Sequence, residues 1–183
     1  MAYYLGIDQS LTATGLCLLA ADGSVETLET VDPEKRRGPS RLAFVKTRTE
    51  ALLERRVIFV AMEGYSYNST GRVFQLGEVG GVLQLLVHEH RVPLATVAPA
   101  ALKKFATGNP SAAKEDMVTA AKAAGAKAQD DNQADAFFLA QIAHCMGTGK
   151  LPEKRSQLEV LHRLKNPKVK TVRRIRKLVK HAL

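Results

Sequence analysis

The 183-residue chain has few cysteines and no long apolar run, and each deficit excludes a class of protein. Its two cysteines, Cys17 and Cys145, stand far apart among apolar neighbours, which argues against a disulfide framework or a cysteine metal site. No apolar run approaches the roughly 20 residues that a membrane span needs. The N-terminus also lacks a basic segment followed by an apolar one. We therefore expect a cytoplasmic protein with no membrane partner.

Acidic residues are nearly missing from the C-terminal segment 154–183, which contains eleven Lys or Arg and one acid, Glu159. This segment carries a charge of +10, whereas residues 1–153 sum to −1 of the net +9. Such a density of positive charge favours a polyanionic partner. We prefer nucleic acid over a membrane surface because the apolar residues of this segment are few and form no wide stripe. A solvated tail that only aids solubility is the alternative.

The length and the charge distribution together predict one globular domain followed by an appendage. We assign residues 1–150 to the globular domain and residues 151–183 to a basic tail that binds nucleic acid. The candidate DNA contacts in the tail are Arg173, Arg174, Arg176 and Lys177.

Apolar periodicity predicts an α/β fold with a mixed sheet. Three successive apolar segments separated by turn signals indicate antiparallel strands, and a later apolar run, 57–62, is typical of a central strand covered on both faces. A polar loop, 32–39, contains Lys35-Arg36-Arg37. Ser111 is a plausible N-cap of the helix that follows it. The predicted strands are 3–7, 15–20, 25–31, 57–62 and 94–97, and the predicted helices are 40–56, 73–90, 99–105, 111–124 and 133–146.

The predicted helix 73–90 contains three glycines, Gly77, Gly80 and Gly81. Each costs about 1 kcal/mol relative to alanine inside a helix. Their clustering therefore indicates the close approach of another backbone, either that of the sheet or that of a second subunit.

Two carboxylates end predicted strands, and a third lies on an apolar helix. Asp8 ends the first strand and Glu63 ends the strand 57–62, so both would open onto one sheet edge if these strands are parallel neighbours. Asp135 lies on a helix that is apolar nearly all round, where an isolated charge would be very costly unless it is paired or binds a cation. Asp130 and Asp131 precede it, and helix capping is their simplest role.

Oxygen ligands without histidine or cysteine fit Mg²⁺ or Mn²⁺ better than zinc. Two such ions about 3.5–4 Å apart would support in-line hydrolysis of a phosphodiester. The spacing of the carboxylates thus predicts a magnesium-dependent nuclease, with Mn²⁺ as a substitute ion.

The same residues resemble a known family, the RuvC-type Holliday junction resolvases among the ribonuclease H-like nucleases. Gly6-Ile7-Asp8 followed by Thr14-Gly15 resembles the motif that ends in the family's first metal-binding aspartate. Ala61-Met62-Glu63 resembles the motif that carries its glutamate, and Gln133-Ala134-Asp135-Ala136 resembles its last catalytic helix. The resemblance extends from residue 4 to about residue 146.

The resemblance implies a ribonuclease H-like fold with a mixed five-stranded sheet flanked by helices. It also implies a homodimer that uses the helix from Gly77 to Leu86, and basic residues near the scissile phosphate. Lys103 and Lys114 stand at those positions, with Lys114 as a catalytic candidate; Lys103 and its neighbour Lys104 are candidates for DNA binding. Lys114 can equally be a surface lysine in the first turn of a helix.

One position departs from the family pattern. Where the family places an acidic residue or a histidine three positions before the final aspartate, this chain has Asn132. Asp131, one helical turn from Asp135, can supply the missing charge. We therefore hypothesise that Asp131 is the fourth metal ligand beside Asp8, Glu63 and Asp135, with Asn132 as a cap or a supporting residue.

A Gly/Ser-rich loop after Glu63 holds three further candidates for DNA binding, Tyr65, Tyr67 and Arg72. Aromatic side chains in such a loop can stack on unpaired bases. The alternative is a surface loop with incidental tyrosines. Ser10, Thr12 and Thr14 can contact a phosphate or serve only in a turn. His144 is interpreted as a hydrogen-bonded core histidine without a catalytic role.

We interpret the chain as a homodimeric endonuclease that resolves four-way DNA junctions. A two-fold dimer suits a two-fold substrate because it presents two sites to two equivalent phosphates. A non-catalytic junction-binding protein and a nuclease for flaps or forks remain alternatives. An actin-like phosphotransferase also begins with a strand, Gly-x-Asp and a hairpin, but its two domains need a longer chain.

Overall fold

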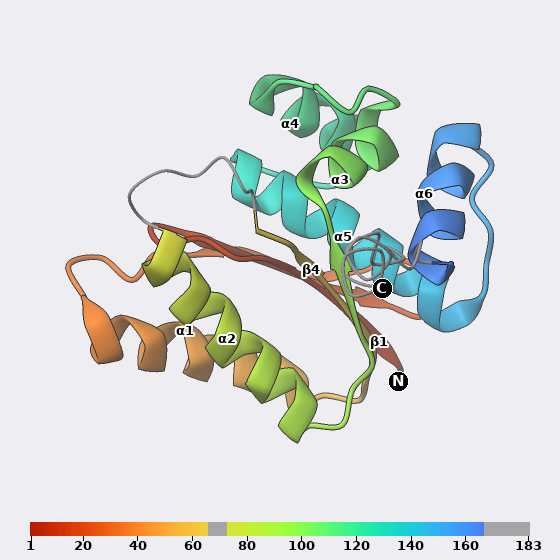
Figure 1. Ribbon diagram of the computed structural model, residues 1–183. Coiled ribbons are helices and arrows are strands. Elements are labelled where there is room, and N and C mark those ends of the chain that lie inside the picture. Colours follow the sequence, from red (N-terminus) through yellow and green to blue (C-terminus); the bar gives the residue numbers. More distant parts are fainter. Residues whose placement is uncertain (66–72, 167–183) are drawn as a thin grey trace, which may run out of the picture.

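The computed structural model describes residues 1–65 and 73–166. In this part of the chain, five strands form one sheet in the order β3-β2-β1-β4-β5 (Figure 1). The pairs β1–β2 and β2–β3 are antiparallel, whereas β1–β4 and β4–β5 are parallel. The strands are β1 (Tyr3–Asp8), β2 (Thr14–Ala20), β3 (Val25–Val31), β4 (Val57–Glu63) and β5 (Leu94–Val97). The predicted mixed sheet is confirmed, and so is the parallel pairing of the strands that end at Asp8 and Glu63.

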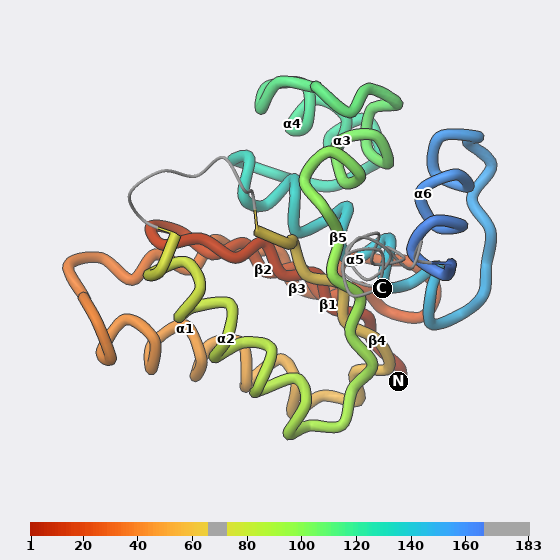
Figure 2. The backbone as a smooth tube through the Cα atoms, viewed as in Figure 1, coloured from red at the N-terminus to blue at the C-terminus, as the bar shows by residue number. Residues whose placement is uncertain are grey.

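Helices cover both faces of the sheet (Figure 2). One face is covered by α1 (Gly38–Leu53) and α2 (Val73–Glu89), which enclose one apolar core with Leu5 and Ile7 of β1. The other is covered by α5 (Asp131–Thr148), which packs on β1, β2 and β4. The remaining helices, α3 (Pro99–Thr107), α4 (Lys114–Ala123) and α6 (Arg155–Lys165), complete the second core together with α5. In the described residues, no helix combines the length and the apolarity that crossing a bilayer requires.

Two glycines let α5 lie directly on the sheet. A Cβ atom on Gly6 would come within 2.1 Å of the carbonyl oxygen of Ala136, and one on Gly15 within 2.1 Å of that of Asn132. Any larger side chain at either position would therefore push the helix away from β1 and β2. This contact fixes the first two turns of α5, which carry Asp135, over the end of β1.

The start of α4 differs from the prediction that Ser111 is its N-cap. The helix begins at Lys114, and Ala113 occupies the N-cap position. The carboxylate of Asp116 accepts a hydrogen bond from the backbone N–H of Ala113 at 3.0 Å, so an acid in the first turn replaces a capping side chain. The prediction from Ser111 was wrong because this residue belongs to a turn before the helix. There, the side chain of Asn109 accepts a hydrogen bond from the backbone N–H of Ser111.

The glycines of α2 have different surroundings. A Cβ on Gly80 would meet the side chains of Gln9 and Tyr65, so the group that approaches closely is a pair of side chains and not the backbone that we predicted. At Gly77 and Gly81, no atom of the described residues lies within 4 Å of such a Cβ, which leaves open space along the helix.

The first part of the predicted basic tail is helical. Val160 and Leu161 of α6 are 2% exposed and join the core formed by α3, α4 and α5. Lys104 of α3 donates to Glu159 of α6 at 2.6 Å, which fixes the helix against the domain. The packed region therefore continues past the boundary that we predicted at residue 150.

Candidate active site

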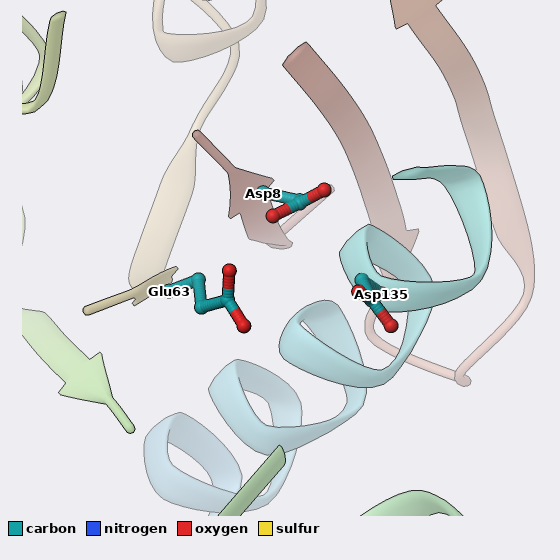
Figure 3. Close-up of side chains that lie close together, drawn as sticks. All are labelled: Asp8, Glu63 and Asp135. Atoms are coloured by element: carbon teal, nitrogen blue, oxygen red, sulfur yellow. The ribbon is translucent and has the colours of Figure 1, made fainter. Parts of the chain in front are cut away.

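Three carboxylates meet at one edge of the sheet. Asp8 ends β1, Glu63 ends the neighbouring parallel strand β4, and Asp135 reaches the same point from α5 (Figure 3). One oxygen atom from each lies within 4.8 Å of the others. We call Asp8, Glu63 and Asp135 the carboxylate triad. The parallel pairing brings the two strand ends together, and the close packing of α5 adds the third group.

The triad is electrostatically unfavourable in the absence of a cation. Burial raises the pKa of Asp8 well above its usual value, and the neighbouring charges of Glu63 and Asp135 raise it further. Burial also raises the pKa of Glu63. For Asp135, burial followed by the charge of Glu63 raises the pKa to about 7. Three carboxylates with raised pKa values in one small space are typical of a functional site.

The triad fits a divalent metal ion. Its donors are carboxylate oxygens, which suit hard cations. The Oδ1 atom of Asp135 is buried and has no hydrogen-bond partner among the described residues, as expected for an oxygen that a metal ion would bind. Asp8, Glu63 and Asp135 are therefore the residues that would hold the metal.

Gln9 supports the triad and was missed in the sequence. Its Nε2 atom donates to the backbone oxygen of Glu63 at 2.9 Å, which ties the segment after β1 to the end of β4. Gly6 and Gly15 were likewise noticed only as parts of a motif, whereas they set the position of α5. A glutamine beside a catalytic aspartate gives no sequence signal because its partner is a backbone atom 54 residues away.

Two lysines border the triad on the side of α3 and α4. The charge of Lys103 lowers the pKa of both Glu63 and Asp135, so its ammonium group lies near both carboxylates. Lys114, at the start of α4, donates to the carboxylate of Asp131, and this hydrogen bond is the main cause of its raised pKa. The side chain of Lys114 is 76% exposed and remains accessible to a ligand.

The fourth acidic position is not part of the triad. Asp131 faces Lys114, and the metal-compatible group among the described residues comprises only the triad. The charge of Asp131 nevertheless raises the pKa of Asp135, which places it nearby. Its role as a fourth ligand stays a prediction. Asp130 is the N-cap of α5 and accepts the N–H of Gln133 at 2.8 Å, as expected for a capping residue.

The other candidates have separate surroundings. Tyr65 lies against α2 and donates to the backbone oxygen of Gly77 at 3.4 Å. His144 is 9% exposed, and its Nε2 atom lies 2.9 Å from the backbone oxygen of Ala21, which confirms a hydrogen-bonded core histidine. Ser10 and Thr14 take part in hydrogen bonds within the loop after β1. Six DNA-binding candidates lie outside the described residues: Tyr67, Arg72, Arg173, Arg174, Arg176 and Lys177.

Comparisons with known proteins agree with this geometry. A search of curated protein sequences finds no significant match. The structure of RuvC from Thermus thermophilus matches with 25% identity and a TM-score of 0.66, over 79% of this chain and 95% of that chain. T. thermophilus RuvC in complex with a Holliday junction substrate matches with 23% identity and a TM-score of 0.67, over 79% and 93%.

These structural matches confirm the ribonuclease H-like fold that the sequence motifs implied. Residues 4–144 match the family described as crossover junction endodeoxyribonuclease RuvC, and this range contains every member of the carboxylate triad. The chain therefore belongs to the RuvC family of crossover junction endodeoxyribonucleases.

Proposed function

We propose that the protein cuts four-way DNA junctions in Mg²⁺ at the carboxylate triad. The observation that carries the proposal is the convergence of Asp8, Glu63 and Asp135, with a buried Asp135 oxygen that has no hydrogen-bond partner within the described part of the chain. The structural match to a RuvC bound to a Holliday junction supports the choice of substrate. Mn²⁺ should replace Mg²⁺ because both ions favour oxygen ligands.

The chain's own residues would position the substrate. The triad would hold the metal, and Mg²⁺ when bound would activate a water molecule and stabilise the leaving 3′ oxygen. Lys103 and Lys114 would attract the phosphate next to the triad, because their ammonium groups lie beside its carboxylates. Gln9 would keep Glu63 in place through its hydrogen bond to the backbone.

A cleavage assay tests the function. We expect the full chain to cut a synthetic four-way junction in Mg²⁺, to leave a linear duplex of the same sequences intact, and to be inactive in EDTA. Gel analysis of end-labelled strands would show cuts in two opposed strands. Tight junction binding without cleavage in either Mg²⁺ or Mn²⁺ would instead indicate a non-catalytic binding protein. If the protein cuts flaps or forks in preference to four-way junctions, those structures replace the junction as the proposed substrate.

We propose a role for Asp131 as the fourth acidic group of the site. Asp131→Asn should slow cleavage and weaken the response to Mg²⁺, because the variant removes a negative charge near Asp135 and also releases Lys114. We expect a rate loss of about 10–100-fold, the range found for residues that support a metal ligand. A rate measurement across a Mg²⁺ titration checks this.

A matched control for this variant is Asp116→Asn, which removes one charge at the start of α4 without approaching the triad. Wild-type rates and an unchanged Mg²⁺ dependence in Asp131→Asn would show that Asp131 is not a ligand.

We also propose a homodimer formed through α2. Phe74 and Leu85 are 90% and 56% exposed, and the open space at Gly77 and Gly81 lies between them along the helix. These positions recur every three or four residues and so share one helix face. An exposed apolar stripe with small residues favours contact with an equivalent helix.

The proposed DNA contacts outside the triad include Tyr65 and the C-terminal segment. The part of that segment after α6 would add phosphate contacts, since it carries many Lys and Arg residues. Lys104 would act mainly by fixing α6, because Glu159 already occupies its ammonium group.

A further inference from the structure

A cavity of about 550 Å³ lies between the loop that follows β1 and the starts of α1 and α2. Its walls come from the loop after β1, the loop between β3 and α1, and the first turns of α1 and α2. In Figure 1, these first turns lie at the same end of the sheet as the first turn of α5. The lining includes Thr12, Asp32, Glu34, Arg37, Arg41 and Gln75.

Arg41 is a buried cation without a partner among the described residues. The residue is 6% exposed, and its Nε atom forms no hydrogen bond with any of them. The ion pairs formed within residues 1–65 and 73–166 do not include it. A buried guanidinium group is very costly unless an anion compensates it. The cavity that Arg41 lines gives such an anion access to the side chain.

The start of α1 adds a second source of positive potential. Arg37 is the N-cap and forms no side-chain cap, and the first turn has no acidic residue. The N–H groups of Gly38 and Ser40 therefore lack intrahelical partners, and the helix dipole is not compensated. Free amides at a helix start together with an arginine form a common site for phosphate.

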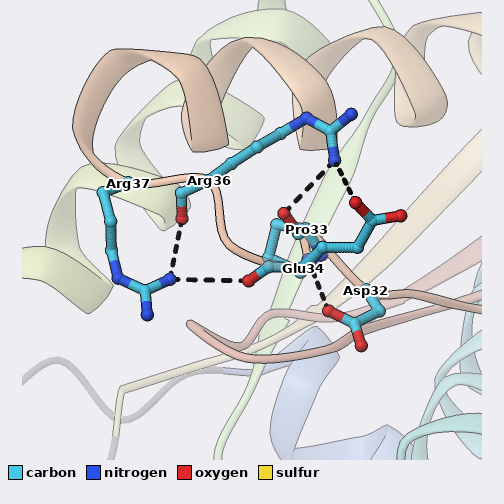
Figure 4. Close-up of polar contacts among 5 residues, drawn as sticks. All are labelled: Asp32, Pro33, Glu34, Arg36 and Arg37. Atoms are coloured by element: carbon cyan, nitrogen blue, oxygen red, sulfur yellow. Dashed lines mark hydrogen bonds and ion pairs between the residues drawn. The ribbon is translucent and has the colours of Figure 1, made fainter.

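The two acids in the lining are already engaged (Figure 4). The carboxylate of Glu34 accepts a hydrogen bond from Arg36 at 3.3 Å, and that of Asp32 accepts the backbone N–H of Glu34 at 2.6 Å. Within the described residues, Arg37 donates to backbone oxygens alone, at 3.0 Å from Arg36 and 3.5 Å from Glu34. Asp32 and Glu34 keep their negative charges, but neither forms an ion pair with Arg37 or Arg41, so both cations can still face a ligand.

We propose that this cavity, lined by Arg37 and Arg41 at the start of α1, binds a backbone phosphate of the DNA strand that crosses the active site. The inference rests on the proposed function, because the strand must pass over the triad. Lys103 and Lys114 lie on the α3 and α4 side of the sheet edge, whereas Arg37 and Arg41 lie on the α1 side. A bound strand would therefore meet cations on both sides of the triad.

Junction binding measured without Mg²⁺ tests the site. We expect Arg41→Gln and Arg37→Gln each to weaken binding about tenfold, as for one charged hydrogen bond. Each should also reduce the slope of log affinity against log salt by about 1, as for one lost phosphate contact. The matched control is Lys46→Gln, which makes the same charge change in α1 at a residue already paired with Glu50 at 3.0 Å. It should leave both quantities unchanged.

A second measurement uses inorganic phosphate without DNA. At constant ionic strength, phosphate should raise the Tm of the wild type and of Lys46→Gln relative to chloride, and should not raise that of Arg41→Gln. If Arg41→Gln does not fold, the same measurement is made on Arg37→Gln, because Arg37 is exposed and its replacement should not impair folding. This variant should lose most of the rise in Tm that phosphate causes in the wild type.

Two results together would overturn the site. In the first, Arg37→Gln binds the junction with the affinity and salt dependence of the wild type; in the second, phosphate does not raise the Tm of the wild type. Stabilisation by phosphate with unchanged junction binding in both variants would show an anion site that does not contact DNA, and would also overturn the proposal. Neither outcome depends on cleavage. A protein that fails to cut junctions in Mg²⁺ would contradict the proposed function separately.

Discussion

Replacing Asp135 by asparagine should abolish junction cleavage and at the same time stabilise the metal-free protein. Asp135 is one of three groups that would hold the metal, so its loss should lower the rate at least as much as removal of one transition-state donor, about 10²–10³-fold. In EDTA, however, the same carboxylate is buried near Glu63, which raises its pKa to about 7. Asparagine has nearly the same shape and no charge.

The stabilising effect has an upper limit that follows from the pKa. The rise of the Asp135 pKa from 3.8 to about 7 corresponds to a destabilisation of the folded state by at most about 4 kcal/mol above neutral pH. Since asparagine brings an amide group that also needs hydrogen-bond partners in this buried place, we expect a smaller gain of about 1–3 kcal/mol and a rise in Tm of several degrees. Thermal denaturation in EDTA at alkaline pH measures it.

The control for Asp135→Asn is Asp130→Asn on the same helix. Asp130 caps α5, and asparagine caps helices equally well; the Thr30 hydroxyl, which donates to Asp130 at 2.7 Å, can accept from the asparagine amide instead. This variant should therefore keep the cleavage rate of the wild type and nearly the same Tm. A fall in Tm for Asp135→Asn in EDTA would mean that its carboxylate is stabilised by the protein alone, which would contradict a site built for a cation. Retained cleavage would exclude Asp135 as a ligand.

The stability of the metal-free protein should fall as the pH rises, and Mg²⁺ should reverse the fall. The pKa values of Asp8, Glu63 and Asp135 are all raised, so the folded state binds more protons than the unfolded state. This stabilising contribution is complete below the unfolded value near 4 and is lost as the pH rises through the folded value, about 7 for Asp135. The free energy of unfolding in EDTA should decrease across that interval.

Magnesium binds the deprotonated triad, so the rise in Tm that it causes should be small near pH 5 and large near pH 8. At about one hundred times the dissociation constant, the gain would be about 2.7 kcal/mol. Melting curves with Mg²⁺ and with EDTA at both pH values measure the difference. An equal Mg²⁺ effect at the two pH values would place the ion at another site. Asp135→Asn should show a weaker pH dependence in EDTA and little response to Mg²⁺.

The two strand-end carboxylates were predictable because each follows an uninterrupted apolar strand. Asp8 and Glu63 are marked by local pattern alone, and the parallel pairing of β1 with β4 makes them neighbours. Asp135 was predictable because it interrupts an apolar helix. The role of Asp131 could not be predicted in the same way, since its contact with Lys114 depends on where α4 begins.

The predicted basic tail shows a different limit. The notable feature of the segment from residue 154 is its charge, and its apolar residues were too few to indicate packing. Val160 and Leu161 nevertheless complete the core beside α3, and the ion pair between Lys104 and Glu159 adds a second contact between the two helices. A short amphipathic helix is stabilised by what it packs against, which a sequence segment does not contain.

The sequence by itself determined the order of the strands and helices as far as residue 146, the identity of the three carboxylates and the family motifs, since these depend on periodicity and on residue type. The tertiary structure decided which groups face each other. It brought α5 onto β1 through Gly6, paired Lys114 with Asp131, and left Arg41 buried beside a cavity with no partner in the described part of the chain. These features depend on distances between residues far apart in the chain, and such distances are set by packing of the whole domain.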